Sequence, residues 1–173
     1  DNVINVWSQI LKNTKNSKLI LKSNLKKDCS RIKKIFKENK LDENILFYEK
    51  TYLPTNHLKL YENIDIALDT FPYNGVTTSF EAIWMGVPVL TMQGYNFNSR
   101  CGESINKNLN LEYLIAKNNE EYISKAKELA ENTDKLIEIR DHIFSNAIES
   151  PLFNQLNFSK TFFSSIENIY NNI

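Results

Sequence analysis

Residues 64–90 hold the pattern that decides the fold, and they read IDIALDTFPYNGVTTSFEAIWMGVPVL. In order, this stretch predicts an apolar strand, a Pro/Asn/Gly turn, a helix opened by two threonines, and a second buried strand. All four glycines of the chain lie in or shortly after it, at Gly75, Gly86, Gly94 and Gly102. Glycine serves where the backbone turns with positive φ or comes close to another group. A strand that turns tightly into a helix N-terminus is a common phosphate cradle, so we expect an anion site here.

Strand and helix patterns alternate on both sides of this stretch. Short apolar strands are expected at residues 19–21, 45–48, 64–68, 87–91 and 113–116. Helices are expected at residues 3–12, 29–38, 58–64, 78–85, 99–109, 120–130, 134–147 and 157–170. This alternation is typical of βαβ units. We therefore expect one α/β domain over residues 1–173, with a Rossmann-like parallel sheet, helices on both faces, and further helices at the C-terminus.

Composition limits the classes of function. The chain has 173 residues, of which 42% are hydrophobic and 24% are charged, as in soluble globular proteins. Its 21 basic and 21 acidic residues cancel, so no overall field favours nucleic acid or an anionic membrane. No zinc-ligand spacing is present, and no apolar run is long enough for a membrane span. These features predict a cytoplasmic protein with a local anion site and no metal.

The turn and the helix start supply the phosphate-side candidates. Ligands of parallel sheets bind outside the carboxyl ends of the strands, which is where this turn lies. Gly75 allows close approach, and the hydroxyls of Thr77 and Thr78 can donate to phosphate oxygens beside the free N–H groups of the first turn. The sequence Thr78-x-x-Glu81 is also a capping box, which needs no ligand. From the local pattern alone, capping is the favoured interpretation.

Three further residues fall on the same expected edge. The carboxylate of Glu81 can accept both hydroxyls of a ribose. Lys22 ends a strand and can reach a phosphate, although an exposed charged strand end is the more usual reason for such a lysine. His57 follows the strand at residues 45–48, and a lone histidine is usually structural or solvated. Asp69 is expected only to end its strand.

The ordered motifs of the chain resemble those of the O-GlcNAc transferase family, glycosyltransferase family 41. That family includes O-linked N-acetylglucosaminyltransferases and SPINDLY-type protein fucosyltransferases. The resemblance covers almost the whole chain and rests on LDTFPYNGVTT at residues 68–78, EAIWMGVPVLTM at 81–92, SRxGxS at 99–104, LIAKNxEEY at 114–122, SPLFN at 150–154, WxxIL at 7–11 and NSxLxLK at 16–22.

The resemblance implies a two-lobed GT-B catalytic region, usually preceded by helical TPR repeats, of which this chain is the C-terminal, donor-binding lobe. It implies that Thr77 and Thr78 bind the diphosphate, that Glu81 binds the ribose, and that His57 lies close to the base. It also implies an inverting, metal-independent transfer without a cofactor, with a UDP-sugar (UDP-GlcNAc) as donor and Ser/Thr of a protein or peptide as acceptor. With these matches, ligand binding becomes the favoured role of Thr77 and Thr78.

The chain also departs from the family pattern. Pro54 stands where a ribose-binding lysine is common, and Val76 replaces a polar residue that often precedes the paired threonines. The family's diphosphate-binding lysine and a histidine of the other lobe lie upstream of Asp1. We therefore expect no catalytic residue within this chain, and no transfer by it alone. The alternatives are a lobe that uses GDP-fucose, one that transfers glucose from UDP-glucose to Asn, or a non-catalytic interaction module.

Overall fold

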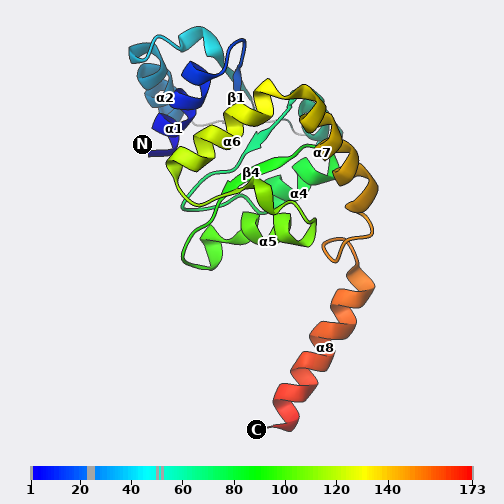
Figure 1. Cartoon of the computed structure of the whole chain (residues 1–173). Coiled ribbons are helices and arrows are strands. Elements are labelled where there is room, and N and C mark those ends of the chain that lie inside the picture. The colour runs from blue at the N-terminus through cyan, green and yellow to red at the C-terminus, as the bar shows by residue number, and fades with distance from the viewer. Residues whose placement is uncertain (1, 23–25, 50, 52, 173) are drawn as a thin grey trace.

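The computed structural model describes residues 2–22, 26–49, 51 and 53–172 of the chain. Within these ranges, helices and strands alternate as the sequence predicts (Figure 1). The strands are β1 (Leu19–Lys22), β2 (Ile45–Tyr48), β3 (Ala67–Leu68), β4 (Val89–Met92) and β5 (Ile115–Ala116). The α-helices are α1 (Asn2–Asn13), α2 (Lys26–Glu38), α3 (Pro54–Leu58), α4 (Thr77–Trp84), α5 (Cys101–Asn108), α6 (Asn119–Glu131), α7 (Thr133–Asn146) and α8 (Gln155–Asn171).

All the described strand pairs are parallel, which confirms the predicted α/β class. Strand β1 pairs with β2, with Leu19 opposite Ile45. Strand β4 lies between β3 and β5, with Ala67 opposite Val89. The predicted sheet therefore consists of two separately hydrogen-bonded parts, one of two strands and one of three. Parallel strands of this kind need helical crossovers, which the intervening helices supply.

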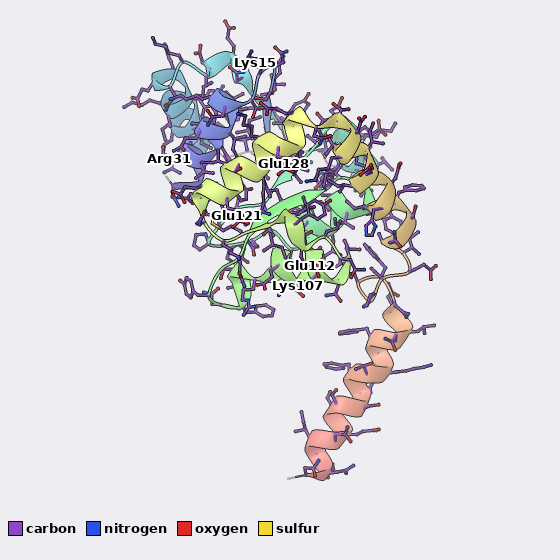
Figure 2. The ribbon with its side chains drawn as sticks, viewed as in Figure 1. Lys15, Arg31, Lys107, Glu112, Glu121 and Glu128 are labelled. Carbon is purple, nitrogen blue, oxygen red and sulfur yellow. The ribbon has the colours of Figure 1, made fainter. Side chains whose placement is uncertain are left out.

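Helices cover both faces of the central strand β4. Leu90 belongs to one core cluster, with apolar side chains from α1, α2 and α6, whereas Val89 belongs to a second, with side chains from α4, α5 and α7. Successive residues of a strand point to opposite faces, so this division follows from the strand geometry. Figure 2 shows Glu121 and Glu128 on α6, whose inward side buries Tyr122 and Leu129.

The strand predicted at residues 64–68 is too long. Only Ala67–Leu68 pairs with β4, because Ile64 ends a 3₁₀ helix, Lys59–Asn63, and its N–H donates to the carbonyl of Tyr61 at 3.1 Å. The carbonyl of Ile64 accepts from Nη1 of Arg140 at 3.1 Å instead of from a neighbouring strand. The helix predicted around residues 58–64 is accordingly α3 followed by this 3₁₀ turn.

Gly86 ends α4 in a left-handed conformation, with φ of +69°. The N–H of Gly86 donates to the carbonyl of Ile83 at 2.9 Å, and that of Val87 donates to Ala82 at 2.8 Å. These two bonds form a Schellman motif, which turns the chain from α4 towards β4. A Cβ at Gly86 would meet no atom within 4 Å, so the glycine is needed only for its backbone conformation.

We expect Gly86→Ala to lower the free energy of unfolding by about 1 kcal/mol, because the left-handed conformation strains any residue that has a Cβ. Urea denaturation followed by circular dichroism measures this loss. Unchanged stability in the variant would contradict the assignment of the strain to this position.

Helix α8 projects away from the rest of the structure (Figures 1 and 2). One side of it carries large apolar residues, and all of them are exposed, with exposed fractions from 47% for Ile166 to 79% for Tyr170. The apolar residues of this side are Leu156, Phe158, Phe162, Phe163, Ile166, Ile169 and Tyr170. None of the helices in the described ranges combines the length and the apolar content needed to cross a lipid bilayer.

Candidate functional site

The structure brings together three of the residues singled out from the sequence. Lys22 ends β1, His57 lies in α3, and Glu81 lies in α4. The ammonium of Lys22 is hydrogen-bonded to Nδ1 of His57, and it donates to Oγ1 of Thr51 at 2.8 Å. On the other side of the ring, Nε2 of His57 lies 2.8 Å from Oε2 of Glu81. Side chains from three elements that are far apart in the sequence thus form one continuous polar chain.

The network fixes the tautomer of His57. The lysine ammonium has only protons to offer, so Nδ1 of the ring is the acceptor and Nε2 carries the hydrogen that is donated to Glu81. The imidazole therefore connects a cation to an anion. The side chains of His57 and Glu81 are 27% and 26% exposed, so both remain accessible to a ligand.

Tyr61 completes the chain and was not identified from the sequence. Its hydroxyl lies 3.1 Å from Oε2 of Glu81 and 3.2 Å from the carbonyl oxygen of Thr78, both acceptors, and its ring packs edge-on against His57 at 5.8 Å. Burial and then the charge of Glu81 raise the pKa of Tyr61, so the phenol stays neutral and donates. The spacing of four residues from His57 to Tyr61 is the signal that could have placed both on one side of a helical turn.

The capping-box interpretation of Thr78 and Glu81 is wrong. Helix α4 begins at Thr77 with Val76 at the N-cap, and Val76 makes no side-chain cap bond. The carboxylate of Glu81 accepts from His57 and Tyr61 instead of returning to the helix start. Thr77 and Thr78 are both exposed at the first turn of α4, where N–H groups lack helical partners.

Gly75 lies in the turn that leads into α4, close to a hydroxyl of the first helical turn. A Cβ built on Gly75 would lie 2.5 Å from Oγ1 of Thr78, so a larger residue here would force this hydroxyl to move. The N–H of Gly75 donates to Oδ1 of Asp69 at 2.7 Å, and its carbonyl accepts from Oγ of Ser79 at 2.9 Å. Hydrogen bonds at both the N–H and the carbonyl of Gly75 therefore hold the turn before α4.

Asp69 has a larger part in this region than the sequence suggests. It is only 6% exposed, and its Oδ2 accepts from Oγ1 of Thr91 at 2.7 Å. Burial raises the pKa of Asp69 to about 6, although the bonds from Gly75 and Thr91 act in the opposite direction. The available signal was an aspartate at the end of a strand and shortly before a glycine, where its oxygens can meet turn amides.

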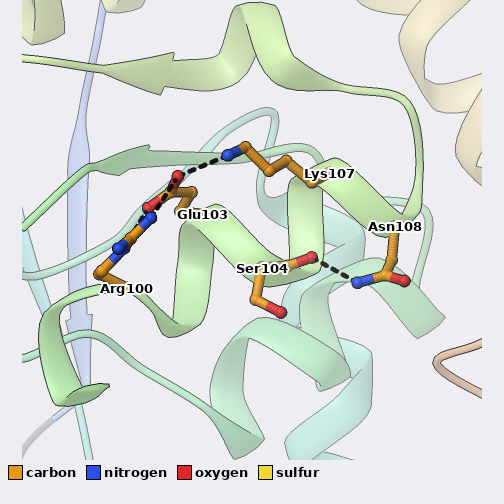
Figure 3. A pocket seen from close by; sticks show the side chains of 5 residues that line it. All are labelled: Arg100, Glu103, Ser104, Lys107 and Asn108. Carbon is orange, nitrogen blue, oxygen red and sulfur yellow. Dashed lines mark hydrogen bonds and ion pairs between the residues drawn. The ribbon is translucent and has the colours of Figure 1, made fainter. Parts of the chain in front are cut away.

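A separate pocket lies on α5, lined by charged and polar side chains (Figure 3). Glu103 is 3% exposed and accepts from Arg100 at 2.8 Å, from Lys107 at 2.7 Å and from Gln93 at 3.0 Å. The hydrogen bond from Arg100 is the main reason why the pKa of Glu103 falls to about 2. Both cations belong to the same helix as Glu103 or to its N-cap, so these ion pairs stabilise α5 itself, and the bond from Gln93 connects the cluster to the segment after β4.

Comparison with known proteins agrees with the motifs. The model of Glycosyl transferase family 41 matches residues 1–162. The chain is 34% identical to a probable UDP-N-acetylglucosamine–peptide N-acetylglucosaminyltransferase SPINDLY of Solanum lycopersicum, over 97% of this chain and 18% of that protein. It is 29% identical to the UDP-N-acetylglucosamine–peptide N-acetylglucosaminyltransferase of Caenorhabditis elegans, over 87% of this chain and 13% of that protein.

A solved structure is similar as well. A mutant of the O-GlcNAc transferase of Thermobaculum terrenum superposes with a TM-score of 0.86 and 28% identity, covering 99% of this chain and 33% of that one. The chain thus spans less than a fifth of the length of these two curated relatives and a third of the solved structure.

Proposed function

This chain belongs to glycosyltransferase family 41, and from that membership we propose that it is the donor-binding lobe of a protein O-glycosyltransferase. In this proposal the enzyme is inverting and metal-independent, and it transfers a sugar from UDP-GlcNAc to Ser/Thr of a protein or peptide. The observation that carries the proposal is the polar chain from Lys22 through His57 to Glu81, next to two exposed threonines at a helix start.

Each residue has a role that its geometry permits. The hydroxyls of Thr77 and Thr78, with the N–H groups of the first turn of α4, bind the diphosphate, and the helix dipole adds about 0.3–1 kcal/mol. Glu81 accepts from the ribose hydroxyls, and the ring of His57 lies against the base. Gly75 admits the ligand to the hydroxyl of Thr78 without a Cβ in the way.

Lys22 acts through His57 and through its charge. Its ammonium donates to Thr51 and to His57, so it holds the imidazole ring in place and adds positive charge on the ligand side. Pro54 leaves the site without the lysine that is common in the family, and Lys22 is the cation that this structure brings to His57.

The proposed chemistry is a direct displacement. The acceptor hydroxyl attacks the anomeric carbon of the sugar, the bond from that carbon to the diphosphate oxygen breaks, and the configuration inverts. The hydroxyl proton passes to a base that the rest of the catalytic region supplies. Negative charge grows on the leaving diphosphate, where Thr77, Thr78 and the start of α4 stabilise it. One such donor, aimed at developing charge in a site that excludes water, is worth about 3 kcal/mol.

The remaining groups of the reaction are proposed to come from the other lobe of the catalytic region, with TPR repeats and the acceptor as further partners. The relatives are more than five times as long as the matched segment, which leaves ample chain for that lobe. The exposed apolar side of α8 offers a surface on which such a lobe can pack, because most helical stability in proteins comes from packing an apolar face against a partner.

A calorimetric titration with UDP and with GDP tests the donor site. We expect UDP to bind, and the double variant Thr77→Ala/Thr78→Ala to bind it at least about tenfold more weakly, since each lost bond to a charged oxygen is worth about 1.5 kcal/mol or more. The matched control is Thr133→Ala, which removes a threonine from the first position of α7.

The outcomes separate the alternatives. Unchanged UDP affinity in the double variant would contradict the assignment of the diphosphate site. Preference for GDP would favour the alternative of a related lobe that uses GDP-fucose. Absence of binding to either nucleotide would favour a non-catalytic interaction module.

A further inference from the structure

We infer that Asp69 is a positioning residue of the donor site, whose carboxylate fixes Gly75 and thereby sets the place of Thr78 at the start of α4. The inference rests on the proposed function, because it assigns Asp69 to the same diphosphate site. Asp69 is not proposed to touch the ligand. It is proposed to affect binding by holding the turn that precedes α4.

Three hydrogen bonds, two to β4 and one to α6, hold Asp69 in place. Its N–H donates to the carbonyl of Leu90 at 2.9 Å, and its Oδ2 accepts from Thr91, the next residue of β4, at 2.7 Å. Its carbonyl oxygen accepts from the hydroxyl of Tyr122 on α6 at 2.9 Å. The remaining oxygen, Oδ1, is therefore presented at a fixed point of the sheet edge.

This fixed oxygen holds the turn. Oδ1 accepts from the N–H of Gly75 at 2.7 Å, a bond strengthened because the acceptor is charged. The carbonyl of the same residue accepts from Ser79 in the first turn of α4, and its Cα faces the hydroxyl of Thr78. A displacement of Gly75 would therefore also move Thr78, one of the residues proposed to bind phosphate.

The second link in the turn is made by Asn74. Its N–H donates to the carbonyl of Asn98 at 2.9 Å, and its Nδ2 donates to the carbonyl of Thr70 at 2.8 Å. These bonds close the turn upon itself and onto the loop after β4. Gly102 of α5 also donates to Oδ1 of Asn74 at 3.3 Å. Within the described part of the chain, the bond from Gly75 is the one that ties the end of the turn nearest to Thr78 to the carboxylate of Asp69, so loss of that carboxylate releases this end.

The carboxylate has no neutralising cation among the described residues. The groups that face it are the N–H groups of Thr70 and Gly75, the hydroxyl of Thr91 and Gly102 of α5, and the neighbouring titratable group is Tyr122. Burial and the charge of Asp69 raise the pKa of Tyr122, so this phenol stays neutral. Burying a charge without a partner of opposite sign costs free energy. The hydrogen bonds that the carboxylate of Asp69 accepts are therefore what keeps it at this buried position.

Three substitutions separate position from charge. Asp69→Asn keeps an acceptor at Oδ1 without the charge, Asp69→Glu keeps the charge but moves the oxygens by one methylene, and Asp69→Ala removes both. Asp65→Ala, at an exposed aspartate four residues earlier, is the matched control. Each variant of the 173-residue chain is titrated with UDP after circular dichroism and thermal unfolding have shown that it is folded.

We expect UDP affinity to fall at least about tenfold in Asp69→Ala and about fivefold in Asp69→Glu, and to stay within about threefold in Asp69→Asn and Asp65→Ala. If Asp69→Ala does not fold, the comparison of the Asn and Glu variants decides the question. Wild-type affinity in Asp69→Glu, or a tenfold loss in Asp69→Asn, overturns the inference.

A second readout needs no ligand. In wild-type protein the amide signal of Gly75 in ¹H–¹⁵N spectra is expected to move with pH, following the pKa of Asp69 near 6, and to stay fixed in Asp69→Asn. Failure of the amide to follow the carboxyl group overturns the inference. If UDP does not bind wild-type protein, the proposed function fails, while this amide titration still tests whether Asp69 holds the turn.

Discussion

Gly102→Ala is expected to lower the free energy of unfolding by about 3 kcal/mol, the upper part of the usual range for overpacking a core. A Cβ at this position of α5 would lie 2.2 Å from Oγ1 of Thr91 and 2.6 Å from Oδ2 of Asp69. Thr91 is fully buried and Asp69 is 6% exposed, so neither side chain has space into which it can retreat. The new methyl group must therefore break their hydrogen bond or push α5 away from β4.

Urea denaturation at pH 7.5 measures the effect, and Gly86→Ala is the matched control. Both variants add one methyl group, but the added Cβ meets open space at Gly86 and buried side chains at Gly102. A loss in Gly102→Ala no larger than that in Gly86→Ala would show that α5 and β4 are not packed as described.

The second large effect concerns the pH dependence of stability. Burial raises the pKa of Asp69 from 3.8 to about 6. Between these pH values the folded state binds more protons than the unfolded state, so the free energy of unfolding falls as pH rises through this range. The shift of about two pKa units corresponds to about 2–3 kcal/mol, and the cost is complete above pH 6.

Asp69→Asn has no charge to bury and lacks this cost. We therefore expect the stability of Asp69→Asn, relative to wild-type protein, to rise by about 2–3 kcal/mol between pH 4 and pH 7.5. Denaturation curves at both pH values give the two differences, and Asp65→Asn, at an exposed site, serves as the control. A relative stability that stays constant or falls with pH would mean that the carboxyl group is not buried as an anion.

The sequence predicts the element order well because period and turn residues are local signals. Helix α4 and strand β4 appear within a residue or two of their predicted ends, and the alternation of apolar strands and helices specifies parallel pairing. The strand predicted at residues 64–68 is too long, because the N–H of Ile64 is bonded to the preceding 3₁₀ turn and its carbonyl is bonded to Arg140. That contact spans 76 positions of the chain, so no local pattern reports it.

In the candidate site too, features with a local sequence signal were predicted and features that depend on tertiary contacts were not. The rule that ligands meet the carboxyl ends of parallel strands placed Lys22 and His57 on one edge, and the structure brings them together. Tyr61 and the carboxylate of Asp69 were missed because their importance comes from tertiary contacts with Glu81 and Thr91. The capping box of Thr78 and Glu81 failed for the same reason.

The central claim is that the start of α4, with His57 and Glu81, holds the diphosphate and nucleoside of a UDP-sugar. Amide shift mapping in ¹H–¹⁵N spectra during addition of UDP tests it most directly. We expect the largest shifts on residues 75–81 and on His57, with little change on α7 or at the pocket formed by Arg100, Glu103 and Lys107. Shifts confined to that pocket, or no shifts at a UDP concentration of several millimolar, would contradict it.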